Sequence, residues 1–191
     1  MAGVKEELWA GLRAAREANL RKAEGLSEYD LRRPMTASGT NLLGVLKHLG
    51  GMECGYLGET FGRDLDRVIP GDEDWEGAAD LWARPDESAG FIVDWYREAC
   101  AHADATIAML ELDAPGWVGH WDEGHQATTL GAMMVRVLGE ECRHGGQLDV
   151  VRELVDGTGD ARDAEKDPEV RRAFVARVQA AADVFGPQQP H

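Results

Sequence analysis

Apolar residues recur at helical spacing along most of the chain, and no run of the alternation typical of strands stands out. The first helical segment covers roughly residues 4–25, and a connection containing Pro34 follows over residues 27–38. The inner stripe of this first segment is apolar throughout: Leu8, Leu12, Ala15 and Leu20. The pattern therefore predicts an all-α protein.

A second helix is predicted to begin near Thr40 and to continue through Tyr56. Its apolar side is well populated: Leu42, Val45, Leu46, Leu49 and Met52. The same segment holds several glycines, each of which costs up to about 1 kcal/mol relative to alanine inside a helix: Gly44, Gly50, Gly51 and Gly55. So many glycines indicate that another helix or a ligand approaches this segment closely.

Residues 62–83 contain Pro70 and a dense acidic run, which predicts a long surface loop with short helical pieces. A third helix is predicted from Asp86, a suitable N-cap, to about Leu112. The loop that follows, residues 113–125, is rich in tryptophan and histidine. Loops as long as residues 62–83 are often functional in a compact domain.

A fourth helix is predicted from a threonine N-cap, Thr128 or Thr129, to about Val155. Its inner stripe combines apolar residues with one carboxylate and one histidine: Leu130, Met133, Val137, Glu140, His144, Leu148 and Val151. This mixture makes the fourth helix the most informative segment of the chain.

After a polar linker, Pro168 stands at the first position of a last amphipathic helix, where proline is favoured. We therefore expect one domain in two parts. Residues 1–157 are predicted to form a four-helix bundle, and residues 158–191 a linker and a C-terminal helix packed on the same domain.

The charge and the cysteines narrow the class of protein. The 191-residue chain carries a formal net charge of −15, which repels phosphate backbones and anionic membranes, so we expect neither nucleic acid nor a membrane as partner. The three cysteines contain no CxxC pair, which argues against a disulfide framework and a cysteine zinc site. No signal peptide and no apolar run near the ~18 residues of a membrane span stand out, so a cytoplasmic location is expected.

A carboxylate lies in line with the apolar stripe of the fourth helix. Glu140 and His144 fall between Val137 and Leu148, on the face that should be buried. Residues four apart are neighbours on a helix surface, and an uncompensated buried carboxylate is very costly. The two residues are therefore either a solvated or hydrogen-bonded pair or two ligands of one metal ion. The adjacent Glu141 leaves a shifted register open, which would put Glu140 at the edge of the buried face.

A third ligand must come from another helix, and His48 is the candidate. It lies beside the apolar positions Val45 and Leu49, where it is either a ligand or a satisfied core histidine. Facing helices of a bundle can converge such side chains on one point. Two nitrogens and one carboxylate oxygen suit Zn²⁺, our first choice, and also Ni²⁺, Fe²⁺ or Mn²⁺. Three protein ligands leave positions open, as in catalytic sites.

Two motifs carry a family resemblance: Thr40-Asn-Leu-Leu-Gly-Val-Leu-Lys-His48-Leu and Gly139-Glu-Glu-Cys-Arg-His144-Gly-Gly-Gln-Leu-Asp. Through them, residues 4–157 resemble the DinB/YfiT-like superfamily of metal-binding four-helix proteins. The resemblance implies one divalent metal ion held by His48, Glu140 and His144. It is also compatible with a homodimer.

Many members of this superfamily have histidine where Glu140 stands. The glutamate version resembles the mycothiol-dependent maleylpyruvate isomerases, and similar relatives have a further histidine where this chain has Gln147. That departure keeps the three ligands and leaves the role of the fourth position open. Those isomerases carry a substantial second domain for which this chain has no room, so we do not expect maleylpyruvate isomerisation itself.

The resemblance implies a low-molecular-weight thiol as co-substrate, which is mycothiol or bacillithiol in the relatives. A thiol bound to a divalent cation is deprotonated at neutral pH, and the thiolate can attack an electrophilic small molecule. We therefore expect a metal-dependent thiol S-transferase whose partners are a small-molecule electrophile and a thiol. The alternatives are a metal-dependent hydrolase that uses a metal-bound water, and a non-catalytic metal-binding protein for stress response or interaction.

Residues outside the three ligands are further candidates. His125 could act as a base or fourth ligand at the mouth of the pocket. Three neighbours could shape the substrate side: Trp117, His120 and Trp121. Each of these residues has a plainer interpretation as a solvated loop residue. We expect His102 to be a satisfied core residue and acidic residues 64–76 to be a solvated loop.

Overall fold

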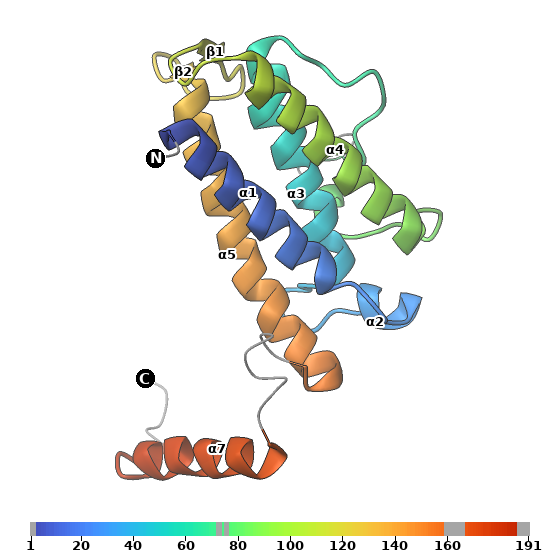
Figure 1. Ribbon diagram of the computed structural model, residues 1–191. Coiled ribbons are helices and arrows are strands. Elements are labelled where there is room, and N and C mark those ends of the chain that lie inside the picture. Colours follow the sequence, from blue (N-terminus) through green and yellow to red (C-terminus); the bar gives the residue numbers. More distant parts are fainter. Residues whose placement is uncertain (1–2, 72–73, 75–76, 159–166, 187–191) are drawn as a thin grey trace.

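Four long helices run side by side in the computed structural model, which describes residues 3–71, 74, 77–158 and 167–186. They are α1 (Val4–Arg21), α3 (Leu42–Leu57), α4 (Ala89–Met109) and α5 (Leu130–Asp156). Helix α3 packs against both α4 and α5, and α5 packs against α1, so the helices form a bundle (Figure 1). The all-α bundle predicted from the apolar spacing is confirmed.

Short elements connect the long helices. Helix α2 (Glu28–Arg32) lies in the predicted connection before α3, and two 3-10 turns, η1 (Glu59–Phe61) and η3 (Ala79–Leu81), lie before α4. A small antiparallel hairpin of β1 (Pro115–Trp117) and β2 (Ala127–Thr129) precedes α5. The sequence pattern did not reveal this hairpin, because strands of three residues are too short to show alternation.

Two helices begin later than the sequence predicted. Asn41, rather than Thr40, caps α3, because its Oδ1 accepts a hydrogen bond from the Gly44 N–H at 2.7 Å. Ser88, rather than Asp86, caps α4 in the same manner. Each cap supplies an oxygen to an N–H group that has no partner within the helix.

Within the described residues, the interior of the bundle contains three apolar clusters; the two larger ones lie toward opposite ends, and the smallest consists of Cys54, Trp95 and Ala99. The cluster near the hairpin includes Leu12, Leu57 and Val137. The cluster near α2 includes Leu31 and Leu148. Because α3 contributes to both clusters and contacts α4 and α5, it is buried on almost every side, which explains its apolar sequence.

A layer of buried polar side chains separates these clusters along the helices. Arg16 donates to both carboxylate oxygens of Glu53, at 2.7 and 2.6 Å. Glu141 accepts hydrogen bonds from Asn19 Nδ2 and from the Tyr96 hydroxyl, each at 2.7 Å. The layer therefore connects α1, α3, α4 and α5 through hydrogen bonds to buried carboxylates, the partners that such groups need away from water.

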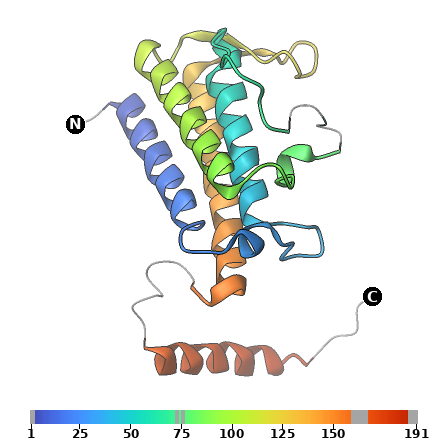
Figure 2. The same cartoon turned by 90° about the vertical axis from the view of Figure 1, so that its right-hand side faces the viewer.

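The last described helix, α7 (Pro168–Asp183), lies apart from the bundle (Figure 2). Its apolar residues Val170, Phe174 and Val178 are each more than half exposed. Arg171 of this helix donates a hydrogen bond to the Gly157 carbonyl at the end of α5, at 2.9 Å. The packing of α7 on the bundle and the division into two parts of one domain stay predictions. Among the described residues, no helix is both long enough and apolar enough to cross a membrane.

Candidate metal centre

The three predicted metal ligands meet between α3 and α5 in the middle of the bundle. One possible ligand atom from each of His48, Glu140 and His144 lies within 4.8 Å of the other two. His144 Nε2 lies 3.5 Å from Glu140 Oε2, and the centroids of the two imidazole rings are 4.9 Å apart. All three residues are partly buried. We call this group the His–Glu–His cluster.

Hydrogen bonds orient both imidazole rings of the His–Glu–His cluster. His48 Nδ1 donates to Asp80 Oδ2 at 2.6 Å, and His144 Nδ1 donates to Gln147 Oε1 at 2.8 Å. Since both Nδ1 atoms are used in this way, the two Nε2 atoms are the candidate ligand atoms. A carboxylate or carbonyl acceptor on the second nitrogen is the usual arrangement of metal-binding histidines.

The donor set of the cluster fits a small divalent cation. Two ligands at ~2.0–2.1 Å from one tetrahedral Zn²⁺ lie ~3.3–3.5 Å apart, which agrees with the 3.5 Å between Glu140 and His144. Burial lowers the pKa of His144, the hydrogen bond to Gln147 partly offsets this effect, and the nearby His48 lowers the pKa further. His144 is therefore neutral at pH 7, the state in which imidazole binds metals.

Asp80 reaches His48 because the segment before α4 is tied to α3. Lys47, which is fully buried, donates from Nζ to the Ala79 carbonyl at 2.8 Å and to the Glu87 carboxylate at 2.9 Å. These bonds hold η3 against the turn of α3 that carries His48. The buried lysine therefore positions the acceptor of the neighbouring histidine.

The glycines of α3 serve two purposes. A Cβ atom on Gly44 would lie 1.8 Å from the Leu81 carbonyl oxygen, so any side chain there would push η3 away from the helix. A Cβ atom on Gly50 would meet the Trp95 ring. Gly51 and Gly55 instead face open space, with nothing within 4 Å of a Cβ. The glycine-rich sequence thus reflects close approach at two positions and a cavity at two others.

A cavity of about 290 Å³ lies along α3 beside the His–Glu–His cluster. Gly51, Gly55 and Tyr56 contribute to its wall, as do Asp80 and His120. Asp80 links the cavity to the cluster, because it also accepts the hydrogen bond from His48. The volume is near the lower end of the range of small-molecule sites, roughly 300–1,000 Å³.

The structure separates the four further candidates that precede α5. His120 lines the cavity, and its Nε2 lies 3.5 Å from the Tyr56 hydroxyl. Trp121 lies beside Tyr56, with ring centroids 6.1 Å apart. Trp117 is 59% exposed and His125 is exposed, and neither lines the cavity. The roles of all four stay predictions, and position favours His120 and Trp121.

The register of α5 differs from the predicted stripe. Glu140 is only partly buried, whereas Glu141 is fully buried. The fully buried carboxylate is thus Glu141, and Glu140 lies at the edge of the buried face. On α4, His102 is partly buried and its Nε2 donates to the Arg63 carbonyl at 2.7 Å, as expected for a satisfied histidine.

Sequence reasoning missed Arg136 and Asp80 near the cluster and left the role of Gln147 open. Gln147 follows His144 by three positions and Arg136 precedes Glu140 by four, so helical spacing could have placed both on the ligand face. Asp80 comes from a separate loop, and no spacing in the sequence signals its contact with His48. A hint was available in Lys47, which lies within an apolar helix next to the candidate ligand His48, because a lysine there needs partners from another segment.

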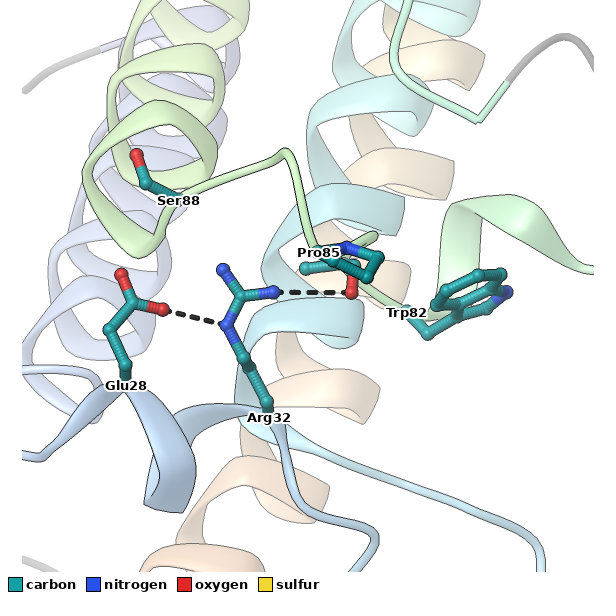
Figure 3. A pocket seen from close by; sticks show the side chains of 6 residues that line it. Glu28, Arg32, Trp82, Pro85 and Ser88 are labelled. Carbon is teal, nitrogen blue, oxygen red and sulfur yellow. Dashed lines mark hydrogen bonds and ion pairs between the residues drawn. The ribbon is translucent and has the colours of Figure 1, made fainter.

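A second hollow lies on another part of the surface, between α2 and the start of α4 (Figure 3). Arg32 lies in its middle and donates to the Glu28 carboxylate at 2.6 Å. Arg32 also donates to the backbone carbonyls of Ala83 and Arg84, at 3.2 and 3.0 Å. These bonds of Arg32 tie α2 to the segment before α4.

A four-helix bundle with a His–Glu–His cluster between α3 and α5 defines a protein of the DinB/YfiT-like class, as predicted. Residues 7–157 match the model of the mycothiol-S-transferase family, and the chain belongs to this family. A comparison with curated proteins finds no match. A crystal structure of a conserved protein from Enterococcus faecalis aligns with a TM-score of 0.59 and 15% identity, covering 83% of this chain and 100% of that one. That similarity supports the fold alone.

Proposed function

We propose that this protein is a metal-dependent thiol S-transferase that uses mycothiol or a similar low-molecular-weight thiol. The observation that carries the proposal is the His–Glu–His cluster beside a cavity of small-molecule size. Membership of the mycothiol-S-transferase family supports the thiol and the transfer reaction. An open set of three ligands supports a catalytic rather than a structural metal.

The cysteines of the chain are poor nucleophiles for such a reaction. Burial, with a smaller contribution from Glu53, raises the pKa of Cys54 to about 12. The same two causes raise the pKa of Cys100 well above its usual value. Cys142 lies two residues from each ligand of α5, which places it on another side of the helix. The nucleophile is therefore an external thiol.

His48, Glu140 and His144 would hold the divalent cation, for which Zn²⁺ is the first choice and Ni²⁺, Fe²⁺ and Mn²⁺ are alternatives. A divalent cation held by these residues would lower the pKa of a thiol, so that the sulfur would be a thiolate at neutral pH. Asp80 and Gln147 fix the two rings before any substrate arrives, which keeps the ligand geometry ready.

The cavity along α3 would hold the electrophile next to the sulfur. Gly51 and Gly55 leave room on the helix surface, and Met52 and Tyr56 give the wall an apolar character. The sulfur electron pair forms the new S–C bond. When the thiol adds across a double bond, its own proton goes to solvent, and the carbon next to the new S–C bond takes up a proton from solvent. When the thiol displaces a group, the leaving group departs with its electron pair.

The test combines elemental analysis with turnover of model electrophiles. We expect about one divalent metal ion per chain in the untagged protein, and turnover that requires added thiol and stops with a chelator. Turnover without thiol would instead support hydrolysis by metal-activated water. No turnover across mycothiol, bacillithiol and the candidate metals would refute the transferase and leave a metal-binding protein without catalysis.

Neighbouring carboxylates provide a matched control for the ligand assignment. Glu140→Gln and His48→Ala are expected to lose the metal and the thiol-dependent activity together. Glu141→Gln changes an adjacent carboxylate that faces the polar layer, and it should retain the metal. Retention of metal by both Glu140→Gln and His48→Ala would contradict the assignment.

A further inference from the structure

Among the described residues of the bundle, four arginines stack on aromatic rings, and three of them also bind a carboxylate. Those three ion pairs are Arg13 with Asp104, Arg33 with Asp30 and Arg67 with Glu98. The fourth is Arg136, whose guanidinium carbon lies 4.7 Å from the ring centroid of Tyr56 and 5.0 Å from that of Trp121. Within the described chain, this guanidinium has no ion pair or hydrogen bond. The chain has 35 acidic and 20 basic residues, so carboxylates are not scarce.

A carboxylate is in fact available one helical turn away from Arg136. Glu140 follows Arg136 by four positions on α5, a spacing at which opposite charges commonly pair. Glu140 instead lies against His144, at 3.5 Å. The guanidinium carbon lies over both aromatic rings, and Arg136 is an exposed residue, so its five N–H donors are accessible to a ligand.

Arg136 adjoins the cavity beside the His–Glu–His cluster. The ring of Tyr56 forms part of the cavity wall and also carries the guanidinium. Neither lysine nor arginine occurs among the described residues that line this cavity, so Arg136 is the cation next to that wall. Met52, Ile69 and Pro70 make much of the rest of the wall apolar, and its two carboxylates are Glu59 and Asp80, so the acid group is expected at the Tyr56 side, where Arg136 lies.

We propose that Arg136 binds the carboxylate of a small organic acid whose apolar body occupies the cavity. A planar guanidinium and a planar carboxylate form two parallel charge-assisted hydrogen bonds, a geometry that also orients the acid. The cavity of about 290 Å³ limits the acid to a small molecule. The identification of this acid as the electrophile rests on the proposed S-transferase function, whereas its binding does not.

The test is a titration of the full chain, as purified, with cinnamate and with its neutral counterpart cinnamamide. Calorimetry gives the two dissociation constants, and tryptophan fluorescence provides a second signal because Trp121 lies beneath Arg136. A charge-assisted pair of hydrogen bonds predicts that cinnamate binds about 10-fold or more tightly than cinnamamide. Arg136→Met should weaken cinnamate by about the same factor and leave cinnamamide unchanged.

Two further variants make the titration decisive. Arg13→Met removes another stacked arginine, one that already has Asp104 as partner, and it should leave cinnamate binding unchanged. Arg136→Lys keeps the charge without the planar fork, and it should weaken cinnamate less than Arg136→Met does. Equal affinity for the acid and the amide, no change in Arg136→Met, or an equal loss in Arg13→Met would overturn the proposal.

The titration and the turnover assay can fail separately. Cinnamate binding through Arg136 in a protein without thiol-dependent turnover would support the acid site and refute the S-transferase. Turnover with unchanged cinnamate affinity in Arg136→Met would support the S-transferase and refute the acid site.

Discussion

Glu140 and Glu141 are neighbours on α5, yet the fold gives them opposite surroundings. Glu140 is partly buried and lies in the His–Glu–His cluster beside the cavity. Glu141 is fully buried and accepts hydrogen bonds from Asn19 and Tyr96. Burial, and next the carboxylate of Glu53, raise the pKa of Glu141 to about 8. One carboxylate is thus available as a ligand, whereas the other keeps its proton at neutral pH.

The difference shows how one helix serves two purposes. The side of α5 that faces the cavity carries Glu140 and His144, which contact each other and are available to bind a ligand. The side that faces α1 and α4 presents Glu141, whose Oε2 and backbone carbonyl accept hydrogen bonds from residues of those helices. We therefore expect changes on the first side to affect binding and changes on the second side to affect stability.

The largest effect is expected for Arg16→Met in the polar layer. Arg16 is buried and binds both Glu53 and Asp104, so its loss leaves a buried carboxylate without its cation. Breaking a buried pair in this way costs about 3–5 kcal/mol of the free energy of unfolding. Urea denaturation of Arg16→Met and the wild-type protein measures this loss. Arg13→Met removes a more exposed pair to the same Asp104 and should cost less than about 1 kcal/mol. Equal losses would contradict the distinction.

Asp80→Asn tests the cavity side of the comparison. The change removes the charged acceptor of His48 Nδ1 while keeping the size of the side chain. Loss of such an acceptor typically weakens metal binding about 10–100-fold. Competition with a coloured chelator measures the affinity, and Asp66→Asn in the same loop is the control. Identical affinities in the two variants would remove Asp80 from the site.

The pH dependence of stability tests the protonated carboxyl of Glu141. The folded protein holds this proton up to a pKa of about 8, whereas the ordinary pKa of 4.5 applies to the unfolded chain. Unfolding therefore releases a proton between these values, so the contribution of Glu141 to stability is fully present below about pH 4.5 and is lost as pH rises toward 8.

The expected slope is at most about 1.4 kcal/mol per pH unit. Glu141→Gln should remove this contribution, as seen by denaturation at several pH values in the presence of a chelator. Parallel curves for the wild-type protein and Glu141→Gln would show that Glu141 does not hold the proton.

The smallest effects are expected for two adjacent glycines of α5. A Cβ atom on Gly145 would lie 2.7 Å from Asn19 Oδ1, whereas one on Gly146 would meet nothing within 4 Å. Gly145→Ala should therefore disturb the bond from Asn19 to Glu141 and cost about 1 kcal/mol. Gly146→Ala should stabilise the helix by up to about 1 kcal/mol. Thermal melts of the two variants should shift in opposite directions, and shifts of the same sign would count against the assignment of the polar side.

Much of the fold and part of the candidate site could be predicted from the sequence. Helical periodicity identified the four bundle helices, and the i, i+4 spacing identified Glu140 and His144 as a pair. His48 became their partner through the family resemblance, since nothing in its own spacing distinguishes a ligand from a core histidine. The sequence could not decide whether Glu140 or Glu141 is the fully buried carboxylate. Adjacent positions differ by about 100° around a helix, and a smaller rotation of the helix changes which of the two faces the core.

What the sequence determined by itself is local: where the helices lie, which faces are apolar, and that Glu140 and His144 share a face. These properties depend on backbone periodicity within one segment. Only the tertiary structure decided that Asp80 accepts a hydrogen bond from His48 and that Arg136 rests on Tyr56 and Trp121. Each of these contacts joins segments distant in the chain, and their geometry is set by how whole helices and loops pack against one another.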